Sequence, residues 1–154
     1  MRKIIYFSDS KFPLAALAGA IHAGLLTAEG KPERGKLWEL PFMNLRKNKE
    51  GKIITLGKDV RGSEIFAISV KGERGMVYRL IESFLEMYKI KEGELRLIDS
   101  GIKDNWLLLA GLFLCRSNFL SPVGRLLASA GIRKAYGRLA KLVQDVKAGL
   151  TNVP

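Results

Sequence analysis

Small polar and charged residues that could hold an anion follow the first apolar run of the sequence. Residues 4–7 are continuously apolar, and Ser8, Asp9, Ser10 and Lys11 come directly after them. An Ala- and Leu-rich segment over 14–26 follows, preceded by Pro13, a residue suited to the first turn of a helix. Hydroxyl groups, a lysine and the unpaired N–H groups of a helix start together suit a phosphate or carboxylate. The segment therefore predicts an anion-accepting turn between a strand and a helix.

Comparable residues follow the other strands that the sequence predicts. The carboxyl ends of parallel strands share one edge of a sheet, and ligands of open α/β sheets gather there. Lys71 and Arg74 join this edge only if the second hairpin strand runs parallel to the first strand of the chain. The candidate ligand-binding residues, with Ser129 as a further neighbour, are Ser8, Asp9, Ser10, Lys11, Lys71, Arg74, Asp99, Ser100, Arg133 and Lys134. A merely solvated polar rim is the competing interpretation.

No catalytic residue, metal site or cofactor can be assigned from motifs. The glycine patterns of phosphate-binding and dinucleotide-binding loops are absent, as is the Gly-x-Ser-x-Gly elbow. His22 is the only histidine, so no His-x-x-x-His pair exists, and we interpret it as a hydrogen-bonded helix residue. Asp59 is explained by a turn and Asp99 by capping the helix that follows, a role that Asp104 could also fill. Cys115, the only cysteine, lies in an apolar run and is expected to be buried.

Hydrophobic spacing predicts the elements that would position these side chains. Strands are expected over 4–7, 53–56, 65–70 and 95–98, the second and third forming a β-hairpin. Helices are expected over 14–26, 32–40, 76–88, 106–114 and 132–146, with the apolar stripe of 76–88 in the core. Residues 123–129 could end a helix or form a last strand, and a strand is favoured because Ala130 and Gly131 would turn into the final helix. The fold class is thus α/β, a three-layer sandwich with a mostly parallel sheet of about five strands and helices on both faces.

Length and charge limit the alternatives. The 154 residues fit one domain over 1–150 with a frayed tail over 151–154, and the apolar run over 106–115 is too short for a membrane span. No secretory signal is evident, so a cytoplasmic location is expected. The net charge of +11 favours acidic partners, but it is spread over two distant regions. Residues 31–61 hold nine basic and four acidic residues, and residues from 121 onward hold six basic and one acidic.

Several phrases of the sequence resemble a bacterial family known as domain of unknown function 3189. They include Ala20-Ile21-His22-Ala23-Gly24-Leu25-Leu26, the hairpin segment over 56–66, and Gly131-Ile132-Arg133-Lys134-Ala135-Tyr136. The resemblance covers roughly residues 4–143 and implies kinship without an established activity. It also implies a Gly-Gly-x-His-Ser-Ser-like loop after the first strand. Ser8 to Pro13 lack that glycine pair and histidine, which suggests a divergent member with an altered or lost function.

Three functions are compatible with these residues. The first is binding of an anionic small molecule, bearing phosphate or carboxylate, without evident catalysis. The second is a basic interaction protein that docks on nucleic acid or another acidic macromolecule, although no known nucleic-acid module is recognisable. The third is an enzyme acting on a phosphorylated substrate. The oligomeric state stays open, because the apolar segment over 106–114 could be buried within one domain or between two copies.

Overall fold

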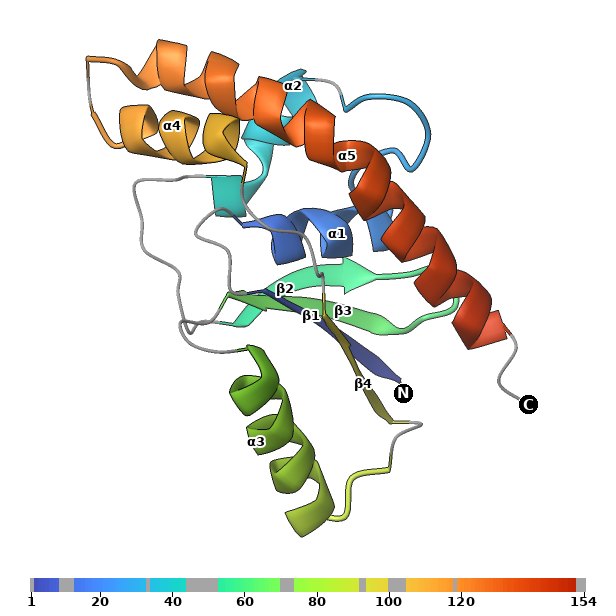
Figure 1. Ribbon diagram of the computed structural model, residues 1–154. Helices are drawn as coiled ribbons and strands as arrows, with labels where there is room; N and C mark the ends of the chain where they lie inside the picture. The colour runs from blue at the N-terminus through green and yellow to red at the C-terminus, as the bar shows by residue number, and fades with distance from the viewer. Residues whose placement is uncertain are drawn as a thin grey trace.

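The computed structural model describes residues 2–8, 13–32, 34–43, 53–69, 74–91, 94–99, 105–117 and 119–151 (Figure 1). The elements in chain order are β1 (Lys3–Ser8), α1 (Leu14–His22), α2 (Arg34–Glu39), the short 3-10 helix η1 (Pro41–Met43), β2 (Ile53–Lys58), β3 (Glu64–Ser69), α3 (Arg74–Met87), β4 (Leu95–Asp99), α4 (Trp106–Cys115) and α5 (Ser121–Thr151). The fold is therefore mixed α/β, as predicted from the way strand-like apolar runs alternate with helix-like apolar spacing along the sequence.

The described strands form one open sheet in the order β2-β3-β1-β4. β1 pairs in parallel with both β3 and β4, whereas β2 and β3 form an antiparallel hairpin. The expected hairpin is confirmed, and so is the condition that its second strand runs parallel to β1. The expectation of a mostly parallel sheet of about five strands is wrong, since the sheet formed by the described residues is mixed and has four strands.

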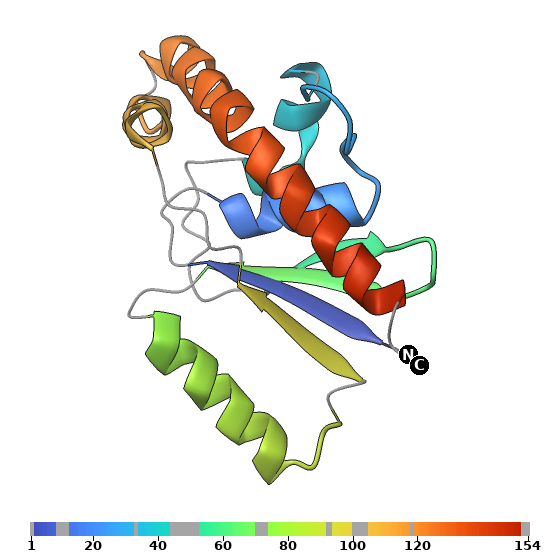
Figure 2. The same cartoon turned by 45° about the vertical axis from the view of Figure 1, so that its right-hand side comes forward.

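Helix α1 lies at the centre of the molecule. All nine of its residues are buried, because it lies between the sheet and α5 and contacts both (Figures 1 and 2). Gly19 allows this close approach: a Cβ atom built at Gly19 would clash with Leu56 Cδ1 of β2. On the sheet, Ile4 and Tyr6 of β1 are fully buried. An apolar helix packed on the central strand thus forms the core.

The segment over 123–129 is helical, so the strand expected there is wrong. It forms the start of α5, which packs antiparallel against α4. The physical reason is a row of small buried residues at helical spacing: Gly124, Ala128 and Gly131 face α4. Their contacts with α4 outweigh the local apolar pattern that favoured a strand, and Gly131 packs against Leu108 instead of making a turn.

Helix α3 lies on the opposite side of the sheet from α1 and α5 (Figure 2). The expectation that its whole apolar stripe is core is wrong. Ile81 and Leu85 are half-buried, whereas Met76, Leu80 and Tyr88 are 62–70% exposed. Among the residues whose burial is described, α3 contributes none to the core and has little contact with the sheet, so most of its stripe stays uncovered.

The start of α4 differs in detail from the expected capping by an aspartate. The Asn105 side chain accepts a hydrogen bond from the Leu108 backbone N–H at 2.9 Å, so Asn105 is the N-cap. Its amide also donates to the carbonyl of Gly131 in α5 at 3.2 Å. Among the helices of the described segments, none has the length and apolarity to cross a membrane.

Candidate functional site

Two of the candidate ligand-binding residues end neighbouring strands at one edge of the sheet. Ser8 is the last residue of β1 and Asp99 the last of β4, and Phe7 pairs with Asp99 across the two parallel strands. Ser8 itself pairs with Ser69, the last residue of β3. Arg74 begins α3, the helix that follows β3. The sheet therefore brings Ser8 and Asp99 to the common edge that the sequence predicts.

The remaining candidates are either outside the described residues or on another element. Asp9, Ser10, Lys11, Lys71 and Ser100 lie outside the described residues. Arg133 and Lys134 are exposed on α5, well inside the helix, and no strand precedes them. The prediction that Arg133 and Lys134 follow the end of a strand is therefore wrong.

Ser129, the further neighbour suggested by the sequence, also lies inside α5. It is buried and accepts a hydrogen bond from Trp38 Nε1 at 3.0 Å. This contact joins α2 to α5, so the hydroxyl of Ser129 has a packing role.

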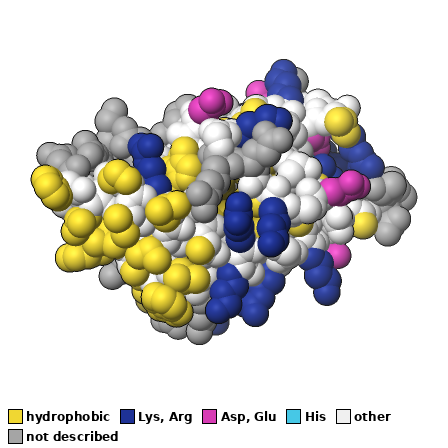
Figure 3. Space-filling model, turned by 90° about the horizontal axis from the view of Figure 1, so that it is seen from above, with side chains coloured by type: hydrophobic (Ala, Val, Ile, Leu, Met, Phe, Trp, Pro, Cys, Tyr) yellow, Lys and Arg dark blue, Asp and Glu magenta, His cyan; other side chains and the backbone are white. Residues whose placement is uncertain are grey.

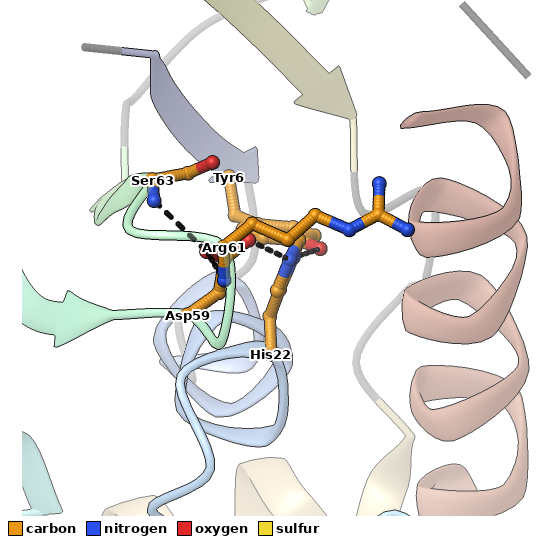
Figure 4. Close-up of polar contacts among 5 residues, drawn as sticks. All are labelled: Tyr6, His22, Asp59, Arg61 and Ser63. Carbon is orange, nitrogen blue, oxygen red and sulfur yellow. Dashed lines mark hydrogen bonds and ion pairs between the residues drawn. The ribbon is translucent and has the colours of Figure 1, made fainter. Parts of the chain in front are cut away.

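A second polar group, absent from the candidates, lies at the other end of the sheet (Figure 4). Tyr6 of β1, His22 at the end of α1 and Asp59 in the β2–β3 turn form a continuous chain of hydrogen bonds. Tyr6 Oη lies 2.7 Å from His22 Nδ1, and His22 Nε2 lies 3.3 Å from Asp59 Oδ2. Asp59 precedes the start of β3, whereas Ser8 and Asp99 end their strands, so the two polar groups occupy opposite edges.

Asp59 also organises the turn that holds it. Its other carboxylate oxygen accepts hydrogen bonds from the backbone N–H groups of Arg61 and Ser63, both at 2.8 Å. Gly62 allows the tight path with a φ of +81° and donates its N–H to the Asp59 carbonyl. The turn therefore fixes the carboxylate that meets His22.

The charges in this network follow from the environment. Burial would raise the pKa of Asp59, but hydrogen bonds from Ser63 and Arg61, together with His22, outweigh it and lower the pKa below its ordinary value. Burial lowers the pKa of His22, and the charge of Lys147 adds to this, while Asp59 opposes it. Burial raises the pKa of the Tyr6 hydroxyl. At neutral pH the network is thus an ionised Asp59, a neutral imidazole and a neutral phenol.

These protonation states fix the direction of each hydrogen bond. An ionised carboxylate only accepts, so His22 Nε2 carries the proton and donates it to Asp59. The other ring nitrogen, Nδ1, is then an acceptor, and Tyr6 donates its hydroxyl proton to it. Each polar atom between the three side chains thus has a hydrogen-bond partner, as a stable buried network requires.

Burial decides what this network can do. The side chains of His22 and Asp59 are 0% and 2% exposed, and Tyr6 is fully buried. A general base must reach the proton that it removes, and a substrate has no access to this imidazole. We interpret the network as structural: its hydrogen bonds hold β1, α1 and the β2–β3 turn together. Among the described residues, no group of three or more His, Cys, Asp or Glu side chains could hold a metal ion.

The sequence predicts half of this network. His22 as a hydrogen-bonded helix histidine and Asp59 as a turn residue are both confirmed by their contacts. Sequence reasoning misses their mutual contact because 37 residues separate them, and no motif has that spacing. The signal that could have indicated it is a lone histidine late in an apolar helix, which needs buried partners for both ring nitrogens.

The neutral state of His22 predicts how stability depends on pH. The unfolded chain takes up a proton at His22 below about pH 6.5, whereas the folded chain resists it. The free energy of unfolding should therefore be level above pH 7 and fall as the pH drops below 6.5, with a slope of at most about 1.4 kcal/mol per pH unit. Urea unfolding at several pH values measures this slope.

Because His22 is the only histidine, its ring proton gives a single NMR signal that can be titrated directly. The control is His22→Gln, in which the slope over the same pH range should disappear. A ring that titrates at or above pH 6.5 in the folded protein would contradict the prediction.

Comparison with known proteins identifies a family and nothing closer. No curated protein and no solved structure matches the chain. The family model described as "Protein of unknown function (DUF3189)" matches residues 3–148, nearly the whole length, and the chain belongs to this family.

Proposed function

We propose that this protein binds an anionic small molecule, bearing phosphate or carboxylate, at the carboxyl edge of its sheet. One observation carries the proposal: β1 and β3 are adjacent and parallel, and the helices that follow them lie on opposite sides of the sheet (Figure 2). The proposal takes the fold as three layers, with helices on both faces. In such folds the loops after the two strands diverge and leave a crevice, where ligands bind.

The residue types around this crevice suit an anion. Ser8 and Ser69 are register partners at the two strand ends; Ser8 is fully buried and Ser69 half-buried, so Ser69 is the more accessible hydroxyl group. In the sequence, Ser10 and Lys11 follow β1 and precede α1, and Lys71 follows β3 and precedes α3. Hydroxyl groups and lysines before helix starts would add donors and positive charge to the partial charge of the helix ends.

Carboxylates at the same edge restrict the ligand class. Asp99 ends β4, and Asp9 follows Ser8 in the sequence. A carboxylate accepts hydrogen bonds and repels phosphate, so these two would favour a ligand that also carries hydroxyl groups. Ser100 would add a hydroxyl group beside Asp99. Arg133 and Lys134 enter the proposal only through the positive potential that they add to one side of the molecule. A phosphorylated polyol or a nucleotide has this combination.

These residues support binding of the anion without catalysis. The one histidine is buried at the opposite edge, so it is not available as a general base for a ligand at the carboxyl edge. An enzyme acting on a phosphorylated substrate and a nucleic-acid-binding protein remain the alternatives. The experiment below separates the first of these from the proposal.

A thermal-shift titration with inorganic phosphate, pyrophosphate, ATP and citrate tests the proposal. A ligand at 100 times its dissociation constant adds about 2.7 kcal/mol of stability, which is roughly 5–10 °C in Tm for a domain of this size. The Lys11→Ala/Lys71→Ala variant should lose the shift.

The matched control is Lys36→Ala/Lys58→Ala, which removes the same charge from α2 and from the end of β2 and should keep the shift. No shift with any of the four probes, or equal loss in both variants, would overturn the proposal. A shift accompanied by turnover of ATP would favour the enzyme.

A further inference from the structure

The α4–α5 hairpin carries large apolar side chains on its outer surface, from the turn between the helices to Trp106 at the start of α4. Phe119, in the turn between the helices, is 93% exposed, and Phe113 and Trp106 of α4 are 77% and 68% exposed. The full set, called the hairpin end below, is Trp106, Leu109, Phe113, Phe119, Leu120, Val123 and Leu126. Figure 3 shows apolar side chains gathered over this part of the molecule. So many large exposed apolar residues in one place indicate a surface that meets a partner.

Internal packing does not account for these residues. The side of α4 that faces α5 is formed by Leu108, Gly111, Leu112 and Cys115, all buried. At 100° per residue, Trp106, Leu109 and Phe113 lie together on the side of α4 that faces away from α5. The apolar outer side is therefore additional to what holds the hairpin together.

Positive charge continues from the hairpin end along α5. Val123, Leu126 and Ala130 share one face of α5 with the exposed basic residues that follow, within an arc of about 140° at 100° per residue. Those basic residues are Arg133, Lys134, Arg138 and Lys141. Over 106–151 the chain has seven Lys and Arg but a single acidic residue, Asp145. Figure 3 shows Lys and Arg side chains gathered beside the apolar ones.

We propose that the hairpin end docks on the surface of an anionic phospholipid bilayer. Phe113, Phe119 and Trp106 enter the boundary between headgroups and acyl chains, where aromatic rings are favoured. The basic face of α5 lies against the headgroups, and each Lys or Arg near such a surface strengthens binding about fivefold. The helices stay folded and lie on the membrane without crossing it.

Charge and shape favour a lipid surface over the two other occupants. A symmetric pair of copies would cover the apolar residues, but it would bring no negative charge to the cations of α5, because 106–151 holds one aspartate. Nucleic acid would match the charge, but it offers no apolar medium for Leu109, Leu120 and Val123. A bilayer offers both negative charge and an apolar interior to the same face of the protein.

Vesicle co-sedimentation with the full chain tests the proposal. Binding to phosphatidylcholine mixed with phosphatidylserine should be at least about tenfold tighter than to phosphatidylcholine alone, and should weaken with salt. Phe113→Ser/Phe119→Ser should weaken binding to mixed vesicles at least about tenfold. Because both side chains are exposed, circular dichroism and Tm should stay unchanged. Arg138→Gln/Lys141→Gln should weaken binding and reduce its salt dependence.

The matched control is Met76→Ser/Leu80→Ser on α3, which removes two exposed apolar side chains elsewhere and should leave vesicle binding unchanged. Three results would overturn the proposal. The first is no binding to mixed vesicles at low salt, or equal binding by the Phe113→Ser/Phe119→Ser variant. The second is that the unaltered protein is a dimer and the Phe113→Ser/Phe119→Ser variant a monomer, which would assign the hairpin end to contact with a second copy. The third is binding to a DNA oligonucleotide but not to vesicles.

Discussion

Replacing Asp59 with alanine is expected to lower the free energy of unfolding by about 3 kcal/mol, a large part of the stability of a single domain. The substitution removes the acceptor for three donors: His22 Nε2 and the backbone N–H groups of Arg61 and Ser63. His22 and Ser63 are buried, so water cannot replace the lost acceptor for them. Each buried donor left unpaired costs about 1–3 kcal/mol. Urea unfolding at pH 7.5 measures the difference.

Two variants show whether the network is the cause. Asp59→Asn keeps an oxygen for the two backbone donors, and the imidazole can move its proton to Nδ1 and accept at Nε2 from the new amide, so about 1 kcal/mol should be lost. Asp145→Ala removes an exposed carboxylate from α5 and should change stability by less than about 0.5 kcal/mol. Equal losses for Asp59→Ala and Asp145→Ala would contradict a structural role for the network.

The elements of the fold follow from the sequence where a local pattern agrees with the tertiary contacts. The buried strand β1, the β2–β3 hairpin and the apolar helix α4 are all predicted by runs whose neighbours in space demand the same structure. Residues 123–129 are the exception. Their apolar residues fit either a strand or a helix, and the choice depends on Gly111 in α4, which the local sequence does not contain. A strand in this segment would place Arg133 and Lys134 after a strand end, which is why their predicted position is also wrong.

The candidate site divides in the same way. Ser8 and Asp99 could be placed together because parallel pairing brings strand ends to one edge, and this needs only the strand positions. The contact of His22 with Asp59 could not be predicted, because it depends on how far α1 reaches along the sheet and on the path of a turn 37 residues later. The family, by contrast, can be predicted from short phrases, and the match over residues 3–148 confirms it.

Gly111→Ala is expected to destabilise the α4–α5 hairpin by about 2 kcal/mol, although alanine is the better helix former. A Cβ atom at Gly111 would lie 2.6 Å from the backbone N of Ala128 and 2.8 Å from its Cα. Backbone atoms cannot move aside as a side chain can, so the helices must separate. Overpacking of this kind costs about 1–3 kcal/mol, whereas the gain in helix propensity is at most about 1 kcal/mol. The clash with backbone places the cost at the upper end of its range, so destabilisation wins.

Gly137→Ala separates these two effects within the same hairpin. Gly137 is exposed in α5, and a Cβ atom there meets nothing within 4 Å, so only helix propensity changes and stability should rise by about 0.5–1 kcal/mol. Cys115, the only cysteine, is buried beside Gly124 and reports opening of the hairpin through its reaction with a thiol reagent. A loss of about 2 kcal/mol makes that reaction about thirtyfold faster in Gly111→Ala when opening is reversible and rapid. In Gly137→Ala the rate should be equal to or below that of the unaltered protein. The same sign of change in both variants would mean that close packing of α4 on Ala128 is not what makes residues 123–129 helical.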